Sequence, residues 1–210
     1  MKRKFGILFI IIGILLILAA LLLIGYNRYE SQSASKASQS VLAVMQNTVE
    51  ETTVSSAVED VYVDHIDPYD QDAAEIAAEM TEKEIDGEYY IGYLSIPILE
   101  LELPVISEWS YPRLRIAPCR HFGSTKTDDL VIAAHNYESH FGKLKQLKTG
   151  DLLTFTDMDG EKILYEVQVI DVLQPTAVDA VKNSNFDLVL YTCTYGGESR
   201  VVVFCNRVKL

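Results

Sequence analysis

The sequence DLVLYTCTYGGESRVVVF, from Asp187 to Phe204, contains two apolar runs separated by a short polar stretch. The first run ends at Cys193 and the second begins at Arg200. Short apolar runs bounded by turn residues are typical of buried β-strands, and two adjacent glycines between them favour a turn. The sequence therefore predicts two neighbouring strands joined by a short loop, with the thiol and the guanidinium at the same end.

Short apolar or alternating runs broken by turn residues continue through the C-terminal part of the chain, from residue 88 to residue 210. This texture is typical of an all-β sandwich or barrel. Turn chemistry agrees at Lys148–Asp151 and Asp157–Gly160, where glycine accepts a positive φ. We predict roughly eight strands: Tyr89–Ile96, Leu101–Ile106, Leu114–Ala117, Asp129–Ala134, Leu152–Asp157, Lys162–Leu173, Asp187–Thr192 and Arg200–Val208.

A long apolar segment near the N-terminus, residues 5–25, contains no charged residue. About 20 apolar residues suffice for a helix to cross the hydrocarbon core of a bilayer. A cleavable signal peptide is the alternative, but its apolar region is normally only about 7–15 residues long. Three basic residues precede the segment and only Arg28 follows it closely, so the positive-inside rule leaves the N-terminus in the cytoplasm. We expect a single-pass anchor in the plasma membrane, with the rest of the chain outside.

Two further segments separate this anchor from the β-rich part of the chain. Residues 26–68 are rich in Ser, Gln, Ala, Thr and Val and turn acidic from Glu50, a composition that buries little. We expect an extracellular stalk there, with a short helix over Val41–Val49 as an alternative. Residues 69–87 place their apolar side chains on roughly one helical face, which predicts a helix that packs on the domain and ends at Gly87. Residues 88–210 then form the folded domain.

The composition excludes some classes of protein. The formal net charge of -12 disfavours a nucleic-acid partner, which requires clustered Lys and Arg. The three cysteines, Cys119, Cys193 and Cys205, form neither a disulfide framework nor paired metal-ligand motifs. Cys119 and His121 lie in a stretch that resembles a loop, but structural zinc needs four well-spaced ligands. We therefore predict no metal and no cofactor.

A thiol and an imidazole follow two similar apolar strands. Cys193 ends one of them, and His135 follows Leu130–Ala134 and opens a polar loop. An unperturbed thiol is only slightly ionised at neutral pH, so a nearby imidazole is what makes it useful as a nucleophile. The alternatives are that Cys193 is a small buried residue, and that His140 rather than His135 is the partner. Ala133 and Ala134 favour His135, because small side chains beside it leave room for a peptide.

Arg200 is the candidate for stabilising negative charge. Its planar guanidinium stays ionised and can hydrogen-bond a substrate carbonyl and the oxyanion that forms when sulfur attacks it. The alternatives are an ordinary surface charge at a strand end and Arg207, which lies near the far end of the same predicted strand.

These residues resemble the sortase family, Gram-positive surface enzymes with a Thr-Leu-x-Thr-Cys strand, a catalytic His after an earlier strand and an Arg on the next strand. The corresponding segments here are VLYTC at Val189–Cys193, AAHN at Ala133–Asn136 and RVVV at Arg200–Val203. Supporting matches extend the resemblance over residues 89–210: YLSIP at Tyr93–Pro97, LPV at Leu103–Val105, HFGKL at His140–Leu144 and LKTGD at Leu147–Asp151. The resemblance implies a β-barrel of about eight strands with short helices.

The chain departs from the family pattern in three places. Val189 replaces the first Thr of the signature, and the loop from Cys193 to Arg200 is short. The Pro175–Phe186 connection, which in this family helps to form the substrate groove, is also short. The resemblance does not assign the class, for which class B-like and class D-like enzymes are the candidates.

By resemblance, the chain is a cysteine transpeptidase that cleaves a C-terminal signal similar to Leu-Pro-x-Thr-Gly between Thr and Gly. Cys193 would form a thioester, His135 would transfer protons and Arg200 would hold the oxyanion. The partners would be secreted proteins bearing the sorting signal and an amine of a cell-wall precursor or a pilin. Thr192 is expected to shape the pocket floor. Tyr191 and Tyr195 are expected either to contact the substrate or to pack in the barrel.

Two other functions compete with this interpretation. A surface cysteine peptidase would use the same residues but only hydrolyse its substrate. A non-catalytic surface-binding domain on a stalk would keep Cys193 buried, so that the thiol would resist alkylation.

Overall fold

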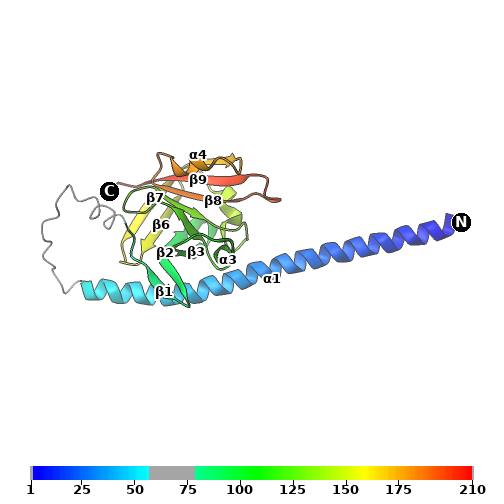
Figure 1. Ribbon diagram of the computed structural model, residues 1–210, viewed down its shortest axis with the longest axis horizontal. Coiled ribbons are helices and arrows are strands. Elements are labelled where there is room, and N and C mark those ends of the chain that lie inside the picture. The colour runs from blue at the N-terminus through cyan, green and yellow to red at the C-terminus, as the bar shows by residue number, and fades with distance from the viewer. Residues whose placement is uncertain (1, 57–78, 210) are drawn as a thin grey trace.

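The computed structural model describes residues 2–56 and 79–209, and the side chains of residues 10–47 and 79–209. One long helix, α1 (Lys2–Ser56), runs along one side of a β-barrel, and its N-terminal half extends away from the barrel (Figure 1). The large apolar side chains from Ile10 to Ile24 are exposed on this projecting half. The helix is long and apolar enough to cross a membrane.

Eight strands close into the barrel. In spatial order they run β2-β3-β4-β5-β8-β9-β7-β6, and a pairing of β2 with β6 completes the ring. Their bounds are Glu88–Ile96 (β2), Leu101–Ile106 (β3), Cys119–Phe122 (β4), Leu130–Ala133 (β5), Leu152–Asp157 (β6), Lys162–Leu173 (β7), Leu188–Cys193 (β8) and Arg200–Arg207 (β9). Two neighbouring pairs, β3–β4 and β5–β8, are parallel, and the others are antiparallel. The predicted all-β barrel of eight strands is confirmed.

Short helices fill the connections, as predicted for the fold. Their bounds are Pro97–Leu99 (η1), Tyr111–Leu114 (α3), Phe141–Gln146 (η2) and Val178–Lys182 (α4). Alternate residues of the strands face the barrel interior, where Ile132, Leu190 and Val203 are fully buried in one apolar cluster. Their neighbours Val131, Val189 and Val202 form a second cluster on the outer face of β5, β8 and β9. This alternation decides which side chains can reach an external site.

The segment between β3 and β4 differs from the prediction. The expected strand Leu114–Ala117 is wrong, because α3 occupies its start. The Ser110 hydroxyl accepts a hydrogen bond from the Arg113 N–H, and proline stands in the first turn, so the local sequence caps a helix. The predicted loop around Cys119 is instead β4, which pairs with β5.

The predicted helix over residues 69–87 is also wrong where the structure describes it. Lys83–Ile85 forms a short strand, β1, that pairs with the start of β2. Asp86 and Gly87 have φ values of 52° and 81°, the left-handed conformation that a two-residue hairpin turn requires. Asp86 and Gly87 therefore make a hairpin turn in place of the helix end expected at Gly87. Residues 69–78 lie outside the described part of the chain.

The predicted stalk is helical as far as residue 56, and part of it packs on the barrel within residues 31–45. Ala34, Ser38, Val41 and Met45 are buried on one face of α1, and the last two join an apolar cluster with barrel residues that include Ile106. The Ser38 hydroxyl donates to the Ile116 carbonyl at 2.9 Å. A composition rich in serine can pack in this way because small side chains allow close approach and the hydroxyl is satisfied. The rest of the predicted stalk, residues 57–68, lies outside the described residues.

Candidate active site

Two adjacent parallel strands bring the thiol and the imidazole together. In the register of β5 and β8, Ala133 pairs with Tyr191. The pairing continues beyond the strand, because the Ala134 N–H donates to the Tyr191 carbonyl at 3.2 Å. The next residues in the same register are His135 and Cys193. Neighbouring strands lie about 5 Å apart, so these two residues end side by side at one edge of the barrel.

A buried side-chain hydrogen bond fixes this register. The Thr192 hydroxyl, which is buried, donates to the Ala134 carbonyl at 2.8 Å. The bond joins the residue before Cys193 to the residue before His135. The bond therefore keeps the Cys193 thiol and the His135 imidazole next to each other at the ends of β8 and β5.

The guanidinium lies on the other side of the thiol. Arg200 begins β9 and is paired with Cys193 in the antiparallel register. The loop between them is closed by a hydrogen bond from the Thr194 N–H to the Ser199 carbonyl, 2.9 Å long. Alternation along the strands places Cys193, His135 and Arg200 on the outer face, together with Val131, Val189 and Val202. All three residues that were predicted to act in catalysis thus lie at one edge of one face.

Cys193 is the accessible thiol of the three. It is half-buried, whereas Cys119 and Cys205 are fully buried. Burial raises the pKa of both buried thiols to about 12, which keeps them protonated. The accessibility of Cys193 argues against the surface-binding alternative, which requires a buried thiol.

His135 lies in a mixed environment that weakens its hold on a proton. Burial lowers its pKa, the charge of Glu30 on α1 raises it, and the charge of Arg115 lowers it, with burial the largest effect. Its ring contacts the Tyr137 ring, with centroids 4.8 Å apart and planes tilted by 34°. A lowered pKa suits a group that must release a proton to a leaving amine and then accept one from an incoming amine.

His140, the alternative partner for the thiol, packs inside the protein and has a structural role. His140 is fully buried, and its Nε2 lies 3.5 Å from the Ser38 hydroxyl of α1. Burial, and then the charge of His135, lower the pKa of His140 to about 4. A neutral buried ring turned toward α1 does not serve the thiol, so the geometry favours His135.

A groove borders the outer face beside these residues. It has a volume of about 180 Å³ and includes Arg200 and Tyr191 in its wall. The remaining lining residues come from the segment before β4, from β4 itself, from the end of β7 and the β7–β8 connection, and from β9: Trp109, Tyr111, His121, Phe122, Leu173, Gln174, Pro175, Ala177, Val178, Val181 and Val202. The walls are mainly apolar and aromatic, which suits an extended peptide with apolar side chains.

The predicted pocket residues occupy different places. Tyr191 lines the groove, and its hydroxyl lies 2.7 Å from His121 Nδ1. Tyr195 is 88% exposed on the β8–β9 loop. Ala133, Ala134 and Thr192 are buried in the barrel wall, which gives them a packing role in place of the expected contact with substrate.

Sequence reasoning missed the part of the groove wall that lies next to Tyr191. Trp109 and His121 form it, with ring centroids 5.2 Å apart. The signals in the sequence were the single tryptophan, Trp109, and the histidine of the stretch Ala117–His121 that was interpreted as a loop. Among the described residues, no group of three or more His, Cys, Asp or Glu side chains is arranged to hold a metal ion.

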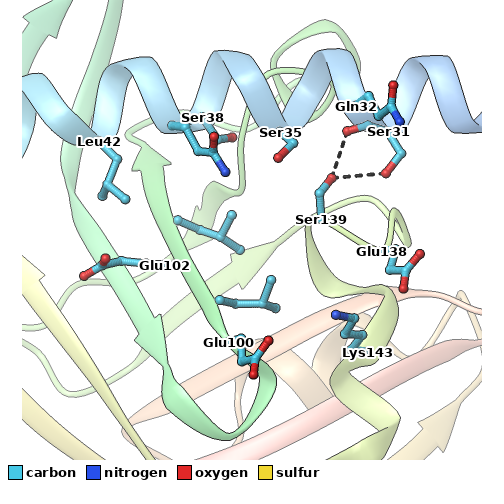
Figure 2. A pocket seen from close by; sticks show the side chains of 13 residues that line it. Ser31, Gln32, Ser35, Ser38, Leu42, Glu100, Glu102, Glu138, Ser139 and Lys143 are labelled. Carbon is cyan, nitrogen blue, oxygen red and sulfur yellow. Dashed lines mark hydrogen bonds between the residues drawn. The ribbon is translucent and has the colours of Figure 1, made fainter.

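The loop that follows His135 also touches α1. Figure 2 shows the Ser139 hydroxyl facing Ser31, with hydrogen bonds to the Ser31 carbonyl at 3.0 Å and to its hydroxyl at 3.2 Å. Beside this contact lies a hollow of about 560 Å³, lined by α1 serines, by Glu138 of the loop and by Lys143 of η2. The long helix is therefore in contact with the chain segment that carries the candidate histidine.

Comparison with known proteins agrees with the fold. The family model described as the sortase domain matches residues 94–208. No curated protein sequence matches the chain. Similar solved structures include sortase C-3 of Streptococcus pneumoniae, 25% identical with a TM-score of 0.53, covering 87% of this chain and 90% of that one. Sortase C-1 of Actinomyces oris is 24% identical with a TM-score of 0.54, covering 80% and 99%. Sortase A of Corynebacterium diphtheriae is 20% identical with a TM-score of 0.53, covering 86% and 93%.

Proposed function

This chain belongs to the sortase family, and from that premise we propose that it is a membrane-anchored cysteine transpeptidase whose nucleophile is Cys193. The observation that carries the proposal is the shared register of β5, β8 and β9. It places His135 and Arg200 on either side of the one accessible thiol. Nucleophile, proton carrier and cation then occupy one edge of the barrel, and Arg200 also lines the neighbouring groove.

The substrate in this proposal is a secreted protein with a C-terminal signal similar to Leu-Pro-x-Thr-Gly. The Cys193 thiolate attacks the carbonyl carbon of the signal's Thr. The carbon–nitrogen bond to Gly breaks, and the His135 imidazolium gives its proton to the departing amine. The product is a thioester on Cys193. An amine of a cell-wall precursor or a pilin attacks that thioester, His135 takes up the proton of the attacking amine, and the thiolate is restored.

Arg200 is suited to the oxyanion of both tetrahedral intermediates. Its Nη1 donates to the Gly197 and Ser199 carbonyls, each at 3.0 Å, so the loop already orients the guanidinium. A guanidinium has five N–H donors, and Nε and Nη2 can point at the developing negative charge. A donor that is fixed before the reaction stabilises that charge without reorganisation.

The groove supports a peptide substrate. Trp109, Tyr111 and Phe122 offer aromatic surface, and Tyr191 continues this surface toward Cys193. Apolar residues of the sorting signal can pack there while the scissile carbonyl reaches the thiol. A partly enclosed groove also favours an amine over water as the second nucleophile.

The apolar half of α1 is the proposed anchor. It exposes large aliphatic side chains that are costly to leave in water, and it carries basic residues only at its first positions and beyond the apolar stretch. We place it in the plasma membrane, with the N-terminus in the cytoplasm and the barrel outside the cell.

The test uses the full chain in detergent micelles with a library of fluorogenic sorting-signal peptides and an amine acceptor. We expect a ligated product that disappears in the Cys193→Ala variant, and the best peptide identifies the motif. A cut peptide without ligation would replace the proposal with a hydrolase. A folded protein with no turnover would leave a binding domain.

A further inference from the structure

The wall of the groove contains a hydrogen-bonded pair of side chains from two different strands. The Tyr191 hydroxyl lies 2.7 Å from His121 Nδ1, and the centroids of the two half-buried rings are 5.8 Å apart. Both residues line the groove, whose other walls are mainly apolar and aromatic. A few polar groups in an apolar wall are what gives a binding groove its specificity.

A β-bulge in β4 directs His121 into this groove. Arg120 of β4 pairs with Ile132 of β5. Phe122 pairs with the next residue, Val131, so β4 has one residue more than β5 at this point, and that residue is His121. In a regular strand, neighbouring side chains point to opposite faces, whereas here His121 and Phe122 both line the groove. Bulges redirect side chains in this way and are frequent next to active sites.

Two aromatic rings hold the imidazole in place. The centroid of the His121 ring lies 3.9 Å from that of Phe122 and 5.2 Å from that of Trp109, with the planes tilted by 33° and 35°. The imidazole is therefore oriented before a substrate enters, and binding does not have to order it.

The pair lies close to the candidate nucleophile along β8. Tyr191 and Cys193 are two residues apart on the outer face of the strand, which is about 7 Å. Their partners on β9 are Val202 and Arg200, and both of these residues line the groove. A peptide whose scissile carbonyl is at the thiol can therefore place another part of its sorting signal against the pair.

The pair can still donate one hydrogen bond and accept another. Burial lowers the pKa of His121 and raises the pKa of Tyr191, so both groups are uncharged at neutral pH. A neutral imidazole has one donor and one acceptor, and a phenol can act as both. One hydrogen lies between Oη and Nδ1, which leaves one donor and one acceptor whichever group donates. A hydroxyl or carboxamide side chain can bond to these groups, and an aliphatic side chain of the same shape cannot.

We propose that His121 and Tyr191 are specificity-determining residues that together select a sorting signal with a hydroxyl or carboxamide side chain at the position that meets them. The inference rests on the proposed transpeptidase function and deepens it by naming this class of substrate. A site whose buried polar groups are left unpaired rejects an apolar analogue by several orders of magnitude. Here the two residues are half-buried and bond to each other, so the discrimination should be that of one neutral hydrogen bond, about tenfold.

The test measures peptide binding to the full chain in detergent micelles, with Cys193→Ala as the parent protein so that no turnover occurs. The fluorescence of Trp109, the single tryptophan of the chain, reports occupancy of the groove. The probes are peptides containing Leu-Pro-x-Thr-Gly in which each position of the signal, and each flanking position, carries in turn Thr, Val, Asn or Leu. We expect Thr to bind more tightly than its isostere Val, and Asn more tightly than Leu, by about tenfold in Kd at a single position.

Two variants of the parent remove the pair, and two more serve as controls. His121→Phe and Tyr191→Phe each keep a ring, and both should lose the preference at the same position of the peptide. His121→Asn keeps a polar atom near the place of Nδ1 and should retain part of the preference. Tyr111→Phe removes a phenolic hydroxyl from an exposed residue of the same groove. Whatever its effect on overall affinity, Y111F should leave the ratio of the Thr and Val peptides unchanged.

The proposal is overturned if no peptide binds, or if the parent binds Thr and Val peptides equally at every position. It is also overturned if the preference survives in H121F and Y191F, or if Y111F removes it to the same extent. Binding needs no turnover, so a preference that H121F and Y191F lose supports the proposal even if no peptide is ever ligated. Ligation by the wild type without such a preference would leave the transpeptidase proposal intact and refute this one.

Discussion

The Thr192→Val substitution tests how the barrel sets the distance between thiol and imidazole. Valine has nearly the shape of threonine, so the buried site keeps its packing and loses only the hydrogen bond to the Ala134 carbonyl, 2.8 Å long. A buried neutral hydrogen bond contributes about 1 kcal/mol to the free energy of unfolding. For a chain of this size that is roughly 3 °C in Tm. The bond ties the residues that precede His135 and Cys193. We therefore expect kcat to fall even under conditions in which the variant is fully folded.

The assay is urea unfolding of the full chain in detergent, followed by the fluorescence of Trp109, the single tryptophan of the chain. Turnover of a sorting-signal peptide is measured on the same samples. Thr192→Ser is the control, since it keeps the hydroxyl and loses a methyl group. The reasoning is refuted if valine matches the wild type in both stability and kcat. It is also refuted if serine, with its hydroxyl retained, loses as much kcat as valine.

Three further changes probe other parts of the account. A Cβ added at Gly92, where φ is +146°, would lie 2.1 Å from the Thr156 carbonyl oxygen. Gly92→Ala should therefore lower the free energy of unfolding by more than about 4 kcal/mol and yield little folded protein. A normal yield of folded protein with an unchanged Tm would contradict this. The depressed pKa of His140, about 4 against 6.5, means that the unfolded chain binds protons first as the pH falls. His140 alone should therefore remove up to about 3 kcal/mol of stability between pH 6.5 and pH 4, and equal urea midpoints at the two pH values would refute the assignment. Iodoacetamide should label Cys193 in the folded chain and spare Cys119 and Cys205, whose pKa values are raised to about 12; peptide mapping that finds either buried cysteine labelled first would overturn this reading.

Local patterns were sufficient to predict most of the barrel. The strands β2, β3, β6 and β7 lie where alternating or continuous apolar runs predicted them, with ends that differ by at most one residue. The runs that end at Cys193 and begin at Arg200 are β8 and β9. Such runs are informative because each strand buries one face in the interior, and that burial requires apolar residues at regular positions in the sequence.

The errors arise where short-range signals compete. The Asp86–Gly87 pair suits both the end of a helix and a tight hairpin, and only the pairing of β1 with β2 decides between them. The predicted strand at Leu114 is wrong because Ser110 caps a helical turn there, and a search for alternating apolar residues does not detect such a cap. β4 is short and half-buried, so its composition resembles a loop.

The packing of α1 on the barrel required the tertiary structure. Its buried face consists largely of Ala34, Ser38 and Val41, residues that in isolation resemble a linker. The packing depends on an acceptor 78 positions away, the Ile116 carbonyl, which the sequence does not reveal. The same holds for Ser31, which reaches Ser139 only because α1 lies against the loop after His135.

The candidate catalytic residues were predictable because the chemistry narrows the choice. A thiol, an imidazole and a guanidinium at strand ends form a set that few other positions in the chain can supply. The groove was not predictable, because Trp109, His121 and the β7–β8 connection meet only when β3 and β4 pair in parallel and the barrel closes.

The most direct test of the central claim is the intact mass of the full chain after incubation with a Leu-Pro-x-Thr-Gly peptide in the absence of an amine acceptor. The account predicts an added mass equal to the peptide up to its Thr, located on Cys193 by peptide mapping and released by hydroxylamine. An adduct on another residue, or cleavage of the peptide by the Cys193→Ala variant, would contradict the assignment of Cys193 as the nucleophile.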